Sequence, residues 1–493
     1  MRLLILLLAA LFSAAVAAQV PARRPDKVLT GTITRADFQR YRQVPFTVPR
    51  GTARIVVAFD HDQREARTVI DLGIEDMHGF RGASGGNKAD FTIGESDATP
   101  SYLPARIDAG RWHLVLAVPN IRAGVIARWQ AKLWFLKAGE ALPSPVVDRG
   151  PGWYRGDLHL HTAHSDGACA SQSGKRVPCP LFKTLETAAT RGLDFVAVTE
   201  HNTTSAHAAM REAAPDFDRL LLIPGREITS FYGHFNIFGV TEPIDYRITP
   251  GGQVTFNAIA DRVHALGGLV SINHPGLPSG EACMGCGWTM SDADPARVDA
   301  IEVVNGGAAR LPNGVDGPLS GAPMWRQIVA GGRPVTAIGG SDNHDALAAS
   351  TALGSIGRPT TIVRAEGLNQ AAILAGIRSG RVFIDMAGSA GSMLDLRVTS
   401  GNAEAVMGGQ LIGPSDKPIV ALLTIIAPSG SRLDLLGNEV LIANETISKA
   451  QEYRLPIDRR DRPLVLRAVV RDPDGAVLLL SNAVIVKASD RLK

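Results

Sequence analysis

One stretch near the middle of the chain constrains the possible fold more than any other: Gly156-Asp157-Leu158-His159-Leu160-His161-Thr162-Ala163-His164-Ser165-Asp166-Gly167. Its first polar residues alternate with two leucines, and on a β-strand that alternation places Asp157, His159 and His161 on one face. Two imidazoles two positions apart at a strand end can bind one cation, and Asp166 supplies a carboxylate a short turn later. The stretch therefore predicts a metal site at the end of an apolar strand.

The region from Trp153 to about Asp385 alternates between strand-like and helix-like segments. We expect strands at 155–160, 195–199, 220–223, 235–240, 269–273, 300–304 and 335–338. We expect helices at 181–191, 206–213, 254–266 and 323–330. Such alternation is typical of an α/β fold, and seven strands predict a barrel related to the (β/α)8 type but one unit short. We assign residues 153–388 to this barrel.

Both flanks of the barrel are predicted to be all-β, since a chain of 493 residues is too long for a single core. Residues 27–140 contain short β-prone runs between Gly, Pro, Asn and Asp clusters, which favours a β-sandwich or jelly-roll-like domain. A proline- and glycine-rich linker is expected at 141–152. Residues 389–493 have a similar pattern of short β-prone runs and contain no histidine. We therefore expect a small β-sandwich with a supporting or docking role and no part in the chemistry.

The N-terminus has the pattern of a secretory signal peptide. Arg2 precedes an apolar stretch from Leu3 to Phe12, and small residues follow up to a cleavage position near Ala18 or Gln19. The stretch is too short to span a bilayer, and no other segment is apolar for long enough. We therefore expect residues 1–18 to be removed and the mature protein to be secreted or periplasmic, with no membrane anchor.

The chain has four cysteines, Cys169, Cys179, Cys283 and Cys286. In an oxidising compartment they favour two disulfides. The competing interpretation is a zinc site with four thiolate ligands, since Cys283 and Cys286 have C-x2-C spacing, but Cys169 and Cys179 lack it. The spacing leaves all three disulfide pairings open.

Two features argue against other classes of function. The formal net charge is +3 without a run of Lys or Arg, so bulk charge gives no reason to expect nucleic-acid binding. The segment from Gly82 to Gly86 matches the G-x-S-x-G elbow of serine hydrolases around Ser84. No apolar strand precedes it and no helix follows it, which favours a glycine-rich loop. His61, His78 and His113 are scattered, and we interpret them as surface or packing residues.

The chemistry-bearing residues fall at the ends of the predicted strands. Nine of the twelve histidines lie between positions 159 and 344. The strand-end groups are His159 with His161, Glu200 with His201, Glu227, His274, and Asp342 with His344. Because the carboxyl ends of barrel strands converge at one mouth, these side chains are expected to meet there. Clustered His, Asp and Glu side chains predict a transition-metal site.

These motifs resemble the PHP (polymerase and histidinol phosphatase) metal-dependent hydrolases. The His-x-His motif, the Glu200-His201 pair, the His274-Pro275 step and the Asp342-x-His344 motif carry the resemblance. The Gly-Asp-Leu-His-Leu-His-Thr run and the exported, sandwich-flanked layout are most similar to the CehA/McbA-like branch. The resemblance implies a distorted (β/α)7 barrel. Many relatives have Thr-Asp-His where this chain has Thr199-Glu200-His201, which leaves the role of Glu200 open.

The resemblance also implies two or three divalent metals, as Zn, Mn or Fe. It implies one metal at His159, His161, Glu227 and Asp342, a second at Glu227 and His274, and a third at Asp166, His201 and His344. Only six residues separate Glu227 from His234, too few for a parallel crossover, so the chain is expected to turn back there. His234 is then either a metal ligand or a catalytic residue that contacts substrate.

Other polar residues near these motifs receive lesser roles. Asp157 is expected to orient a ligand histidine, and His164 to be a solvent-side neighbour. His207 and His264 lie on predicted helices, and we expect both at the surface. Arg226 and Arg310 could bind an anion at the mouth, although the surface interpretation is preferred for both.

The predicted function is that of an exported metal-dependent hydrolase. A metal cluster lowers the pKa of bound water, supplies hydroxide at neutral pH and clamps the attacked and leaving oxygens. We expect a phosphoesterase acting on a small-molecule or oligomeric phosphodiester or phosphomonoester. One alternative is a carboxylic ester or carbamate hydrolase of CehA type, and another is a non-enzymatic binding protein. The oligomeric state stays open.

Overall fold

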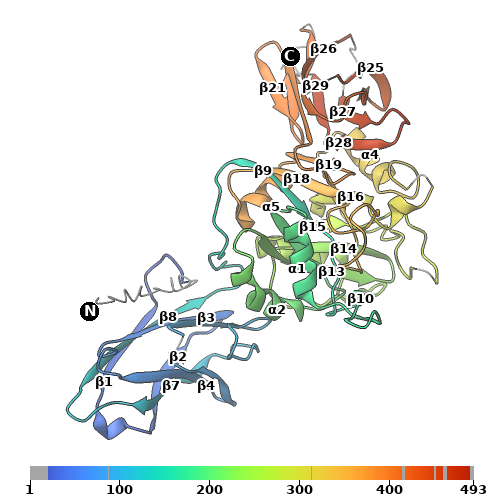
Figure 1. Cartoon of the computed structure of the whole chain (residues 1–493). Coiled ribbons are helices and arrows are strands. Elements are labelled where there is room, and N and C mark those ends of the chain that lie inside the picture. Colours follow the sequence, from blue (N-terminus) through green and yellow to red (C-terminus); the bar gives the residue numbers. More distant parts are fainter. Residues whose placement is uncertain are drawn as a thin grey trace, which may run out of the picture. The chain divides into compact units, whose positions relative to one another are not determined.

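The computed structural model describes residues 20–488 except 87, 282, 313, 414–416, 449–450 and 459–462 (Figure 1). The predicted signal peptide lies outside the described residues. The chain divides into two compact units. The first comprises residues 20–94, 98–137 and 141–145, and the second comprises 95–97, 138–140 and 146–488.

The first unit is a β-sandwich, as the sequence predicted. Its strands are β1 (Lys27–Ile33), β2 (Tyr41–Val48), β3 (Arg54–His61), β4 (Val69–Asp76), β5 (Gly79–Ser84), β6 (Asp90–Gly94), β7 (Gly110–Asn120) and β8 (Ala127–Leu136), with a 3-10 turn η1 (Arg35–Asp37). They form two antiparallel four-stranded sheets, β1-β8-β3-β6 and β2-β7-β4-β5. Alternate side chains of both sheets, including Trp112 and Leu133, fill one buried core, which is the arrangement of a sandwich.

The second unit begins with the region that contains the predicted metal motifs. Its strands are β9 (Gly152–Asp157), β10 (Ala168–Ala170), β11 (Arg176–Pro178), β12 (Phe195–Val198), β13 (Leu221–Ser230), β14 (Gly233–Phe238), β15 (Leu269–Ile272), β16 (Ala300–Asn305), β17 (Thr336–Gly340), β18 (Thr360–Ala365) and β19 (Val382–Asp385). Its helices are α1 (Leu181–Thr190), α2 (Ala206–Ala213), α3 (Phe256–Ala265), α4 (Ala322–Ala330) and α5 (Gln370–Arg378), with 3-10 turns η2 (Ala214–Asp216), η3 (Pro295–Arg297) and η4 (Ala308–Arg310).

Helix α3 illustrates how the local sequence produces these elements. Phe256, Ile259 and Val263 recur at helical spacing and are buried in the core against the sheet. The Thr255 side chain accepts a hydrogen bond from the backbone N–H of Ala258 at 3.1 Å, which caps the first turn. Gly267, with φ of +81°, follows the helix and lets the chain turn into β15.

The sheet departs from a strict alternation of strands and helices. Its order is β17-β16-β15-β14-β13-β12-β9-β18-β19, and β12 pairs in parallel with β13 and β9. However, β13, β14 and β15 are successive antiparallel neighbours, and only Phe231 and Tyr232 separate β13 from β14. The turn expected between Glu227 and His234 is therefore confirmed, because two residues allow a hairpin but no helical crossover.

Strand β17 approaches β9 only beyond the strand ends in the described part of the chain, where two backbone hydrogen bonds join Asn343 to His159 and His161. No sheet ladder runs from β17 back to β9 among the described residues, and an isolated parallel bridge links Leu160 with Asn343, just beyond the ends of those strands. The structure thus shows a mixed, strand-rich fold, and the seven-stranded barrel stays an inference from the sequence.

The C-terminal β-region is built onto the same sheet. Its strands are β20 (Met393–Ser400), β21 (Ala403–Val406), β22 (Gln410–Gly413), β23 (Ile419–Ile426), β24 (Arg432–Gly437), β25 (Val440–Thr446), β26 (Gln451–Ile457), β27 (Leu464–Arg471), β28 (Val477–Ser481) and β29 (Val484–Ala488). A four-stranded sheet, β21-β20-β23-β26, shares a core with β24, β27 and β29, and β28 pairs with β19 (Figure 1). The sheet therefore runs on across the expected boundary at residue 388.

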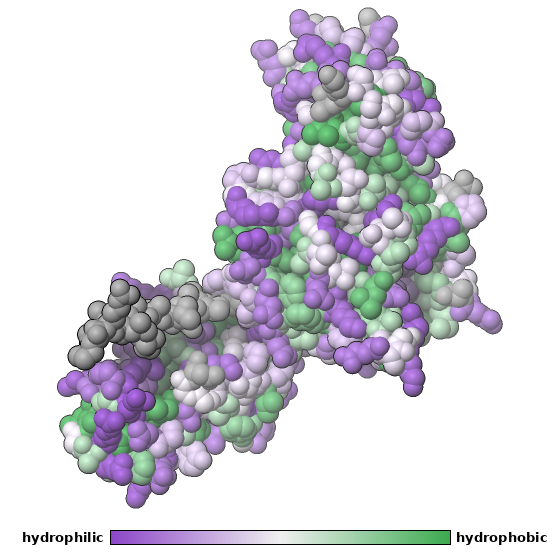
Figure 2. Space-filling view, in the orientation of Figure 1, coloured by the Kyte–Doolittle hydropathy of each residue, from purple (hydrophilic) through white to green (hydrophobic). Residues whose placement is uncertain are grey.

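Figure 2 shows hydrophilic residues spread over the visible face of each unit, with hydrophobic residues scattered among them. Among the described residues, every helix is too short or too polar to cross a bilayer.

Candidate metal centre

The predicted motif residues meet beyond the strand ends of the second unit. The chain stays extended past β9, where the backbone N–H of His161 donates to the Asn343 carbonyl at 3.0 Å. This contact brings the His-x-His motif beside the Asp342-x-His344 motif. All nine predicted site residues lie in this neighbourhood: His159, His161, Asp166, His201, Glu227, His234, His274, Asp342 and His344.

The first group surrounds a point between His159, His161, Glu227 and Asp342. His159 Nε2 lies 3.5 Å from Glu227 Oε1 and 3.4 Å from Asp342 Oδ1. His161 Nε2 lies 3.6 Å from Glu227 Oε2 and 3.3 Å from Asp342 Oδ1. Both Nε2 atoms are buried without a hydrogen-bond partner. Buried ring nitrogens without a partner are costly, and a shared cation would satisfy them.

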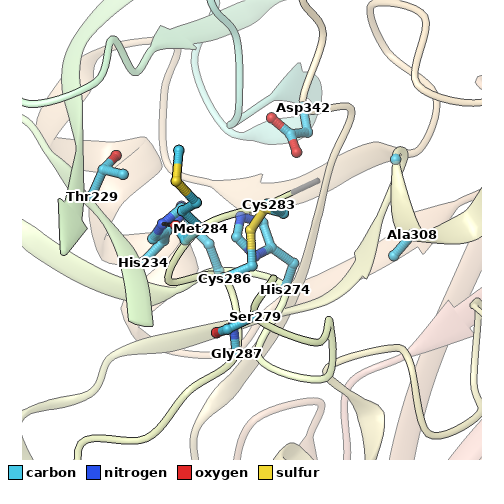
Figure 3. The surroundings of a disulfide bond; sticks show 12 residues. Thr229, His234, His274, Ser279, Cys283, Met284, Cys286, Gly287, Ala308 and Asp342 are labelled. Atoms are coloured by element: carbon cyan, nitrogen blue, oxygen red, sulfur yellow. Dashed lines mark hydrogen bonds between the residues drawn. A yellow bond between two sulfur atoms is a disulfide. The ribbon is translucent and has the colours of Figure 1, made fainter. Parts of the chain in front are cut away.

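The second group adds His234 and His274 on the other side of Glu227. His234 Nδ1 lies 3.4 Å and His274 Nε2 lies 3.3 Å from Glu227 Oε1. His234 Nε2 is 3.2 Å from the Met284 carbonyl, so its N–H donates there and its Nδ1 lone pair faces Glu227. Figure 3 shows both rings beside the Cys283–Cys286 disulfide. His234 is only 5% exposed, and its two predicted roles, metal ligand and substrate contact, stay predictions.

The third group is the one open to solvent. Asp166 Oδ1 lies 3.5 Å from His201 Nε2 and 3.3 Å from His344 Nε2. The His161 ring stacks on both histidines, with centroids 4.3 Å apart in each case. The Asp166 side chain is 56% exposed, whereas the Glu227 side chain is 1% exposed. A metal held here would keep positions free for water or substrate.

Glu227 connects the groups. Its Oε1 faces His159, His234 and His274, and its Oε2 faces His161 and His201. It lies on β13 with its side chain opposite in direction to that of Arg226, as the alternation of a strand requires. Asn273 Nδ2 donates to Oε1 at 2.9 Å and holds the carboxylate in place. This geometry is that of a carboxylate that can bridge two cations.

The charges of the cluster stabilise one another. Burial alone would raise the pKa of Glu227, but His159 and the other facing histidines hold that pKa well below its usual range. Burial would likewise lower the pKa of His159, yet Asp342, Glu302 and Glu227 raise it well above its usual value. The protein thus favours ionised carboxylates beside ring nitrogens that would otherwise bind protons. Cations can replace those protons, which is typical of a metal site.

The donor set fits divalent transition metals. The ligand candidates of the three groups described above are imidazole nitrogens and carboxylate oxygens, which suit Zn, Mn and Fe. The backbone is strained at two of them, since His274 has φ of +28° and Asp342 has φ of +52°. Left-handed backbone at residues other than glycine is concentrated at functional sites. The geometry fixes neither the number nor the identity of the metals.

Glu302 is a functional residue that the sequence analysis missed. It lies on β16 with 1% exposure, and its Oε1 accepts a hydrogen bond from His159 Nδ1 at 2.9 Å. Its Oε2 accepts from the backbone N–H of His274 and from Asn305 Nδ2, each at 3.0 Å. It therefore turns the free Nε2 of His159 toward the first group. The signal was a lone carboxylate inside the apolar run from Ala300 to Asn305, because such a charge needs a buried partner.

Two neighbouring carboxylates have structural roles. Asp157 accepts hydrogen bonds from the backbone N–H groups of His159, Ser341 and Gly357. It thus holds the main chain, and the predicted role of orienting a ligand ring belongs to Glu302 instead. Glu200 accepts from the Thr162 backbone at 3.1 Å and from the hydroxyls of Thr162 and Ser165. Its longer side chain secures the loop that carries Asp166.

Several lesser expectations need correction. Arg226 is buried, and its guanidinium donates to the carbonyls of Glu242 and Ile244, away from Glu227. His207 is also buried, at 4% exposure, so its predicted surface position is wrong. The alanine-rich helix α2 gave no sign that this side faces the core.

Other residues singled out in the sequence lie where they were expected, outside the three ligand groups. Arg310 is exposed and donates to the Leu353 carbonyl at 2.7 Å. His164 is half-buried beside Ser205, and His264 pairs with Asp299 at 2.7 Å. Ser84 ends β5 and shares a 3.1 Å hydrogen bond with the hydroxyl of Tyr102, in an antiparallel sheet with no following helix. The serine elbow is therefore absent from this segment.

The cysteines form the two disulfides Cys169–Cys179 and Cys283–Cys286. The first joins β10 and β11, and the backbone N–H of Ala168 donates to the His344 carbonyl at 2.7 Å. The second closes the loop against His234. The prediction of disulfides in place of a four-thiolate zinc site is confirmed, and each bridge braces a loop beside the metal centre.

Comparisons with known proteins find no matching protein-family model and no significantly similar curated protein. Three solved structures are similar. A two-domain protein from Bacteroides vulgatus, described as containing a predicted PHP-like metal-dependent phosphoesterase, is 19% identical over 69% of this chain and 98% of its own, with a TM-score of 0.36. PsfC from Pseudomonas syringae is 17% identical over 47% and 89%, with a TM-score of 0.30. A proposed metal-dependent phosphoesterase from Bifidobacterium adolescentis is 17% identical over 38% and 87%, with a TM-score of 0.26. Because these TM-scores are below 0.5, we draw no argument from them, and the assignment of a function depends on the site geometry.

Proposed function

We propose that the chain is a metal-dependent hydrolase of PHP type, with a distorted seven-stranded barrel, that cleaves phosphoesters. The observation that carries the proposal is the bridging position of Glu227: its Oε1 faces His274 of the second group, its Oε2 faces His201 of the third, and the first group faces both oxygens. Metals bound there would activate a water molecule and hold the attacked and leaving oxygens of an in-line displacement. The CehA/McbA-like affiliation and export remain part of the proposal.

The candidate ligands lie on a buried side and an exposed side of the cluster, and we assign a different role to each. His159, His161, Glu227 and His274 are each at most 3% exposed and provide a rigid, water-excluded anchor. Asp166, His201 and His344 lie on the exposed side, where an anionic ester can enter. His344 Nδ1 donates to the Asp342 carbonyl at 2.9 Å, which keeps Nε2 directed toward Asp166.

The test combines metal analysis with a chromogenic substrate panel. The purified mature protein should contain more than one divalent metal per chain and should hydrolyse an aryl phosphomonoester or phosphodiester. A chelator should abolish turnover, and Mn or Zn should restore it. Preference for an aryl carbamate or carboxylic ester would replace the phosphoesterase by the CehA-type alternative. Bound metal without turnover on any ester would support the binding-protein alternative.

A further inference from the structure

A C-x-x-C loop lies against the second histidine group. The Cys286 sulfur and one ring nitrogen each of His234 and His274 all lie within 4.8 Å of one another. In Figure 3 the disulfide lies beside the His274 ring, and the side chain of Met284, which is exposed, lies near His234. Cys286 is fully buried, whereas Cys283 is half-buried. The disulfide therefore has an inner sulfur, that of Cys286, beside the candidate metal ligands, and an outer sulfur, that of Cys283, in the less buried of the two residues.

The loop is held firmly in this position. Gly280 and Cys283 exchange two backbone hydrogen bonds of 3.1 Å. A Cβ at Gly285 would collide with the Ser230 carbonyl at the end of β13. The Met284 carbonyl, between the two cysteines, accepts the N–H of His234. The same short segment thus positions His234 and places a sulfur atom beside it.

We propose that the Cys283–Cys286 disulfide is a redox control of metal binding, in which reduction frees Cys286 as a thiolate ligand beside His234 and His274. Sulfur and imidazole together are a favoured ligand set for zinc and cobalt. The inference rests on the proposed metal centre and adds a ligand that the sequence did not assign to it. In the oxidised chain the inner sulfur is blocked, and the second group has only His234, His274 and Glu227.

The chemical step is a thiol–disulfide exchange with a dithiol reductant. One reductant thiolate attacks the outer sulfur of Cys283, the S–S bond breaks, and its electron pair leaves on the inner sulfur of Cys286. The second reductant thiol then displaces Cys283 and closes the disulfide of the reductant. The dithiol loses two electrons and two protons. Each cysteine sulfur takes one of these protons, and a metal that binds Cys286 displaces the proton there.

The other disulfide provides an internal control. Cys169–Cys179 joins the two short strands β10 and β11. Neither of its cysteines belongs to a metal-ligand group among the described residues. Its reduction releases two thiols as well, but no thiolate beside two imidazoles. The two bridges therefore separate a ligand effect from a general effect of reduction.

The experiment adds cobalt chloride to the full mature chain, before and after reduction with a dithiol that is removed by gel filtration. The reduced chain should show a thiolate-to-cobalt charge-transfer band and should bind cobalt at least about tenfold more tightly in competition with a chelator. Cys283→Ser should show the band without reduction. Cys286→Ser should never show it, and the Cys169→Ser/Cys179→Ser chain should behave as the unmodified chain does.

The outcomes distinguish this inference from the proposed function. Cobalt binding in both redox states without a charge-transfer band, in a chain with four titratable thiols after reduction, would overturn the inference and leave the metal centre standing. The absence of cobalt binding in both states would overturn both. The comparison of oxidised and reduced unmodified chain decides the matter even if a serine variant does not fold.

Discussion

The two units bury polar atoms in different ways. In the N-terminal sandwich, Arg81 pairs with Asp76 at 2.7 Å, and Tyr102 donates to the Leu72 carbonyl at 2.8 Å. Thr68 Oγ1 and Trp129 Nε1 lack a partner there, but each is a single atom in its own surroundings. In the second unit, by contrast, the partnerless Nε2 atoms of His159 and His161 both face the carboxylates of Glu227 and Asp342.

The difference shows how an unsatisfied atom should be interpreted. A single buried donor without a partner lowers stability and does not by itself indicate a function. A set of partnerless nitrogens around common carboxylates is too expensive to retain without a cation, so the clustering itself indicates function. Substitutions in each unit test this difference.

The largest effect is expected from Glu227→Gln. Because Glu227 Oε1 faces His274 and Oε2 faces His201, loss of the charge should remove more than one metal and all measurable turnover. His274→Ala should remove only one metal and leave the His159/His161 group loaded. Asp385→Asn is the control, since this buried carboxylate of the same unit accepts from its own loop backbone and lies 3.9 Å from Arg155, outside the three ligand groups. The measurement is the metal content per chain. Loss of a single metal from Glu227→Gln would contradict a bridging role for this carboxylate.

His159→Ala should lower turnover by more than about 100-fold, because loss of a direct ligand should exceed the cost of losing an outer partner. The matched variant is His61→Ala in the sandwich, a buried histidine whose Nδ1 contacts only the Asp62 carbonyl at 2.8 Å. It should keep its metal and its activity. Equal metal content in the two variants would remove the distinction between the units.

Glu302→Gln should weaken metal binding by about 10–100-fold while the ligands themselves remain. The amide can no longer accept strongly from His159 Nδ1, so the ring loses its fixed orientation. Asp434→Asn is the control, because Asp434 is a buried carboxylate that pairs with Arg432 and Arg471 in the C-terminal sandwich. It should lower thermal stability and leave metal affinity unchanged. Chelator competition measures the affinities.

Metal loading should release protons, and affinity should rise with pH. Burial would lower the pKa of His201, but hydrogen bonds to Asp166 and Glu227 raise it to about 10 in the metal-free chain. Its stabilising contribution is complete below the unfolded value of 6.5 and is lost as pH rises through about 10. A bound metal needs the neutral ring, so it displaces the proton. Calorimetry of metal binding at neutral pH, in buffers of different ionisation enthalpy, measures the protons released. His201→Gln should release fewer protons than the unmodified chain. Metal affinity that does not change with pH would refute this prediction.

The smallest effect is expected from Ser84→Ala. The substitution removes one hydrogen bond to Tyr102, worth about 1 kcal/mol. Turnover should not change, because the serine lies in an antiparallel sheet without the turn that a nucleophile needs. Denaturant unfolding and the ester panel measure both quantities. An inactive variant with intact metal would revive the serine-hydrolase interpretation.

The sequence predicted which side chains lie together well where their spacing is local. His159 with His161, and Asp342 with His344, are two residues apart, so strand geometry alone brings each pair to one side. Glu302 was missed because its partner His159 lies 143 positions away. The β13–β14 hairpin was anticipated from the short gap before His234, but the pairing of β14 with β15 was not.

By itself, the sequence determined the kind of chemistry, since the residue types, their local spacing and the cysteine count follow directly from it. The tertiary structure decided which atoms face one another: the two sides of Glu227, the carboxylate behind His159, the sulfur beside His234 and the continuation of the sheet through β19 and β28. The physical reason is that local geometry is set by backbone bond lengths and dihedral preferences. Contacts between segments distant in the chain depend on how the buried faces of whole elements pack, which no short pattern encodes.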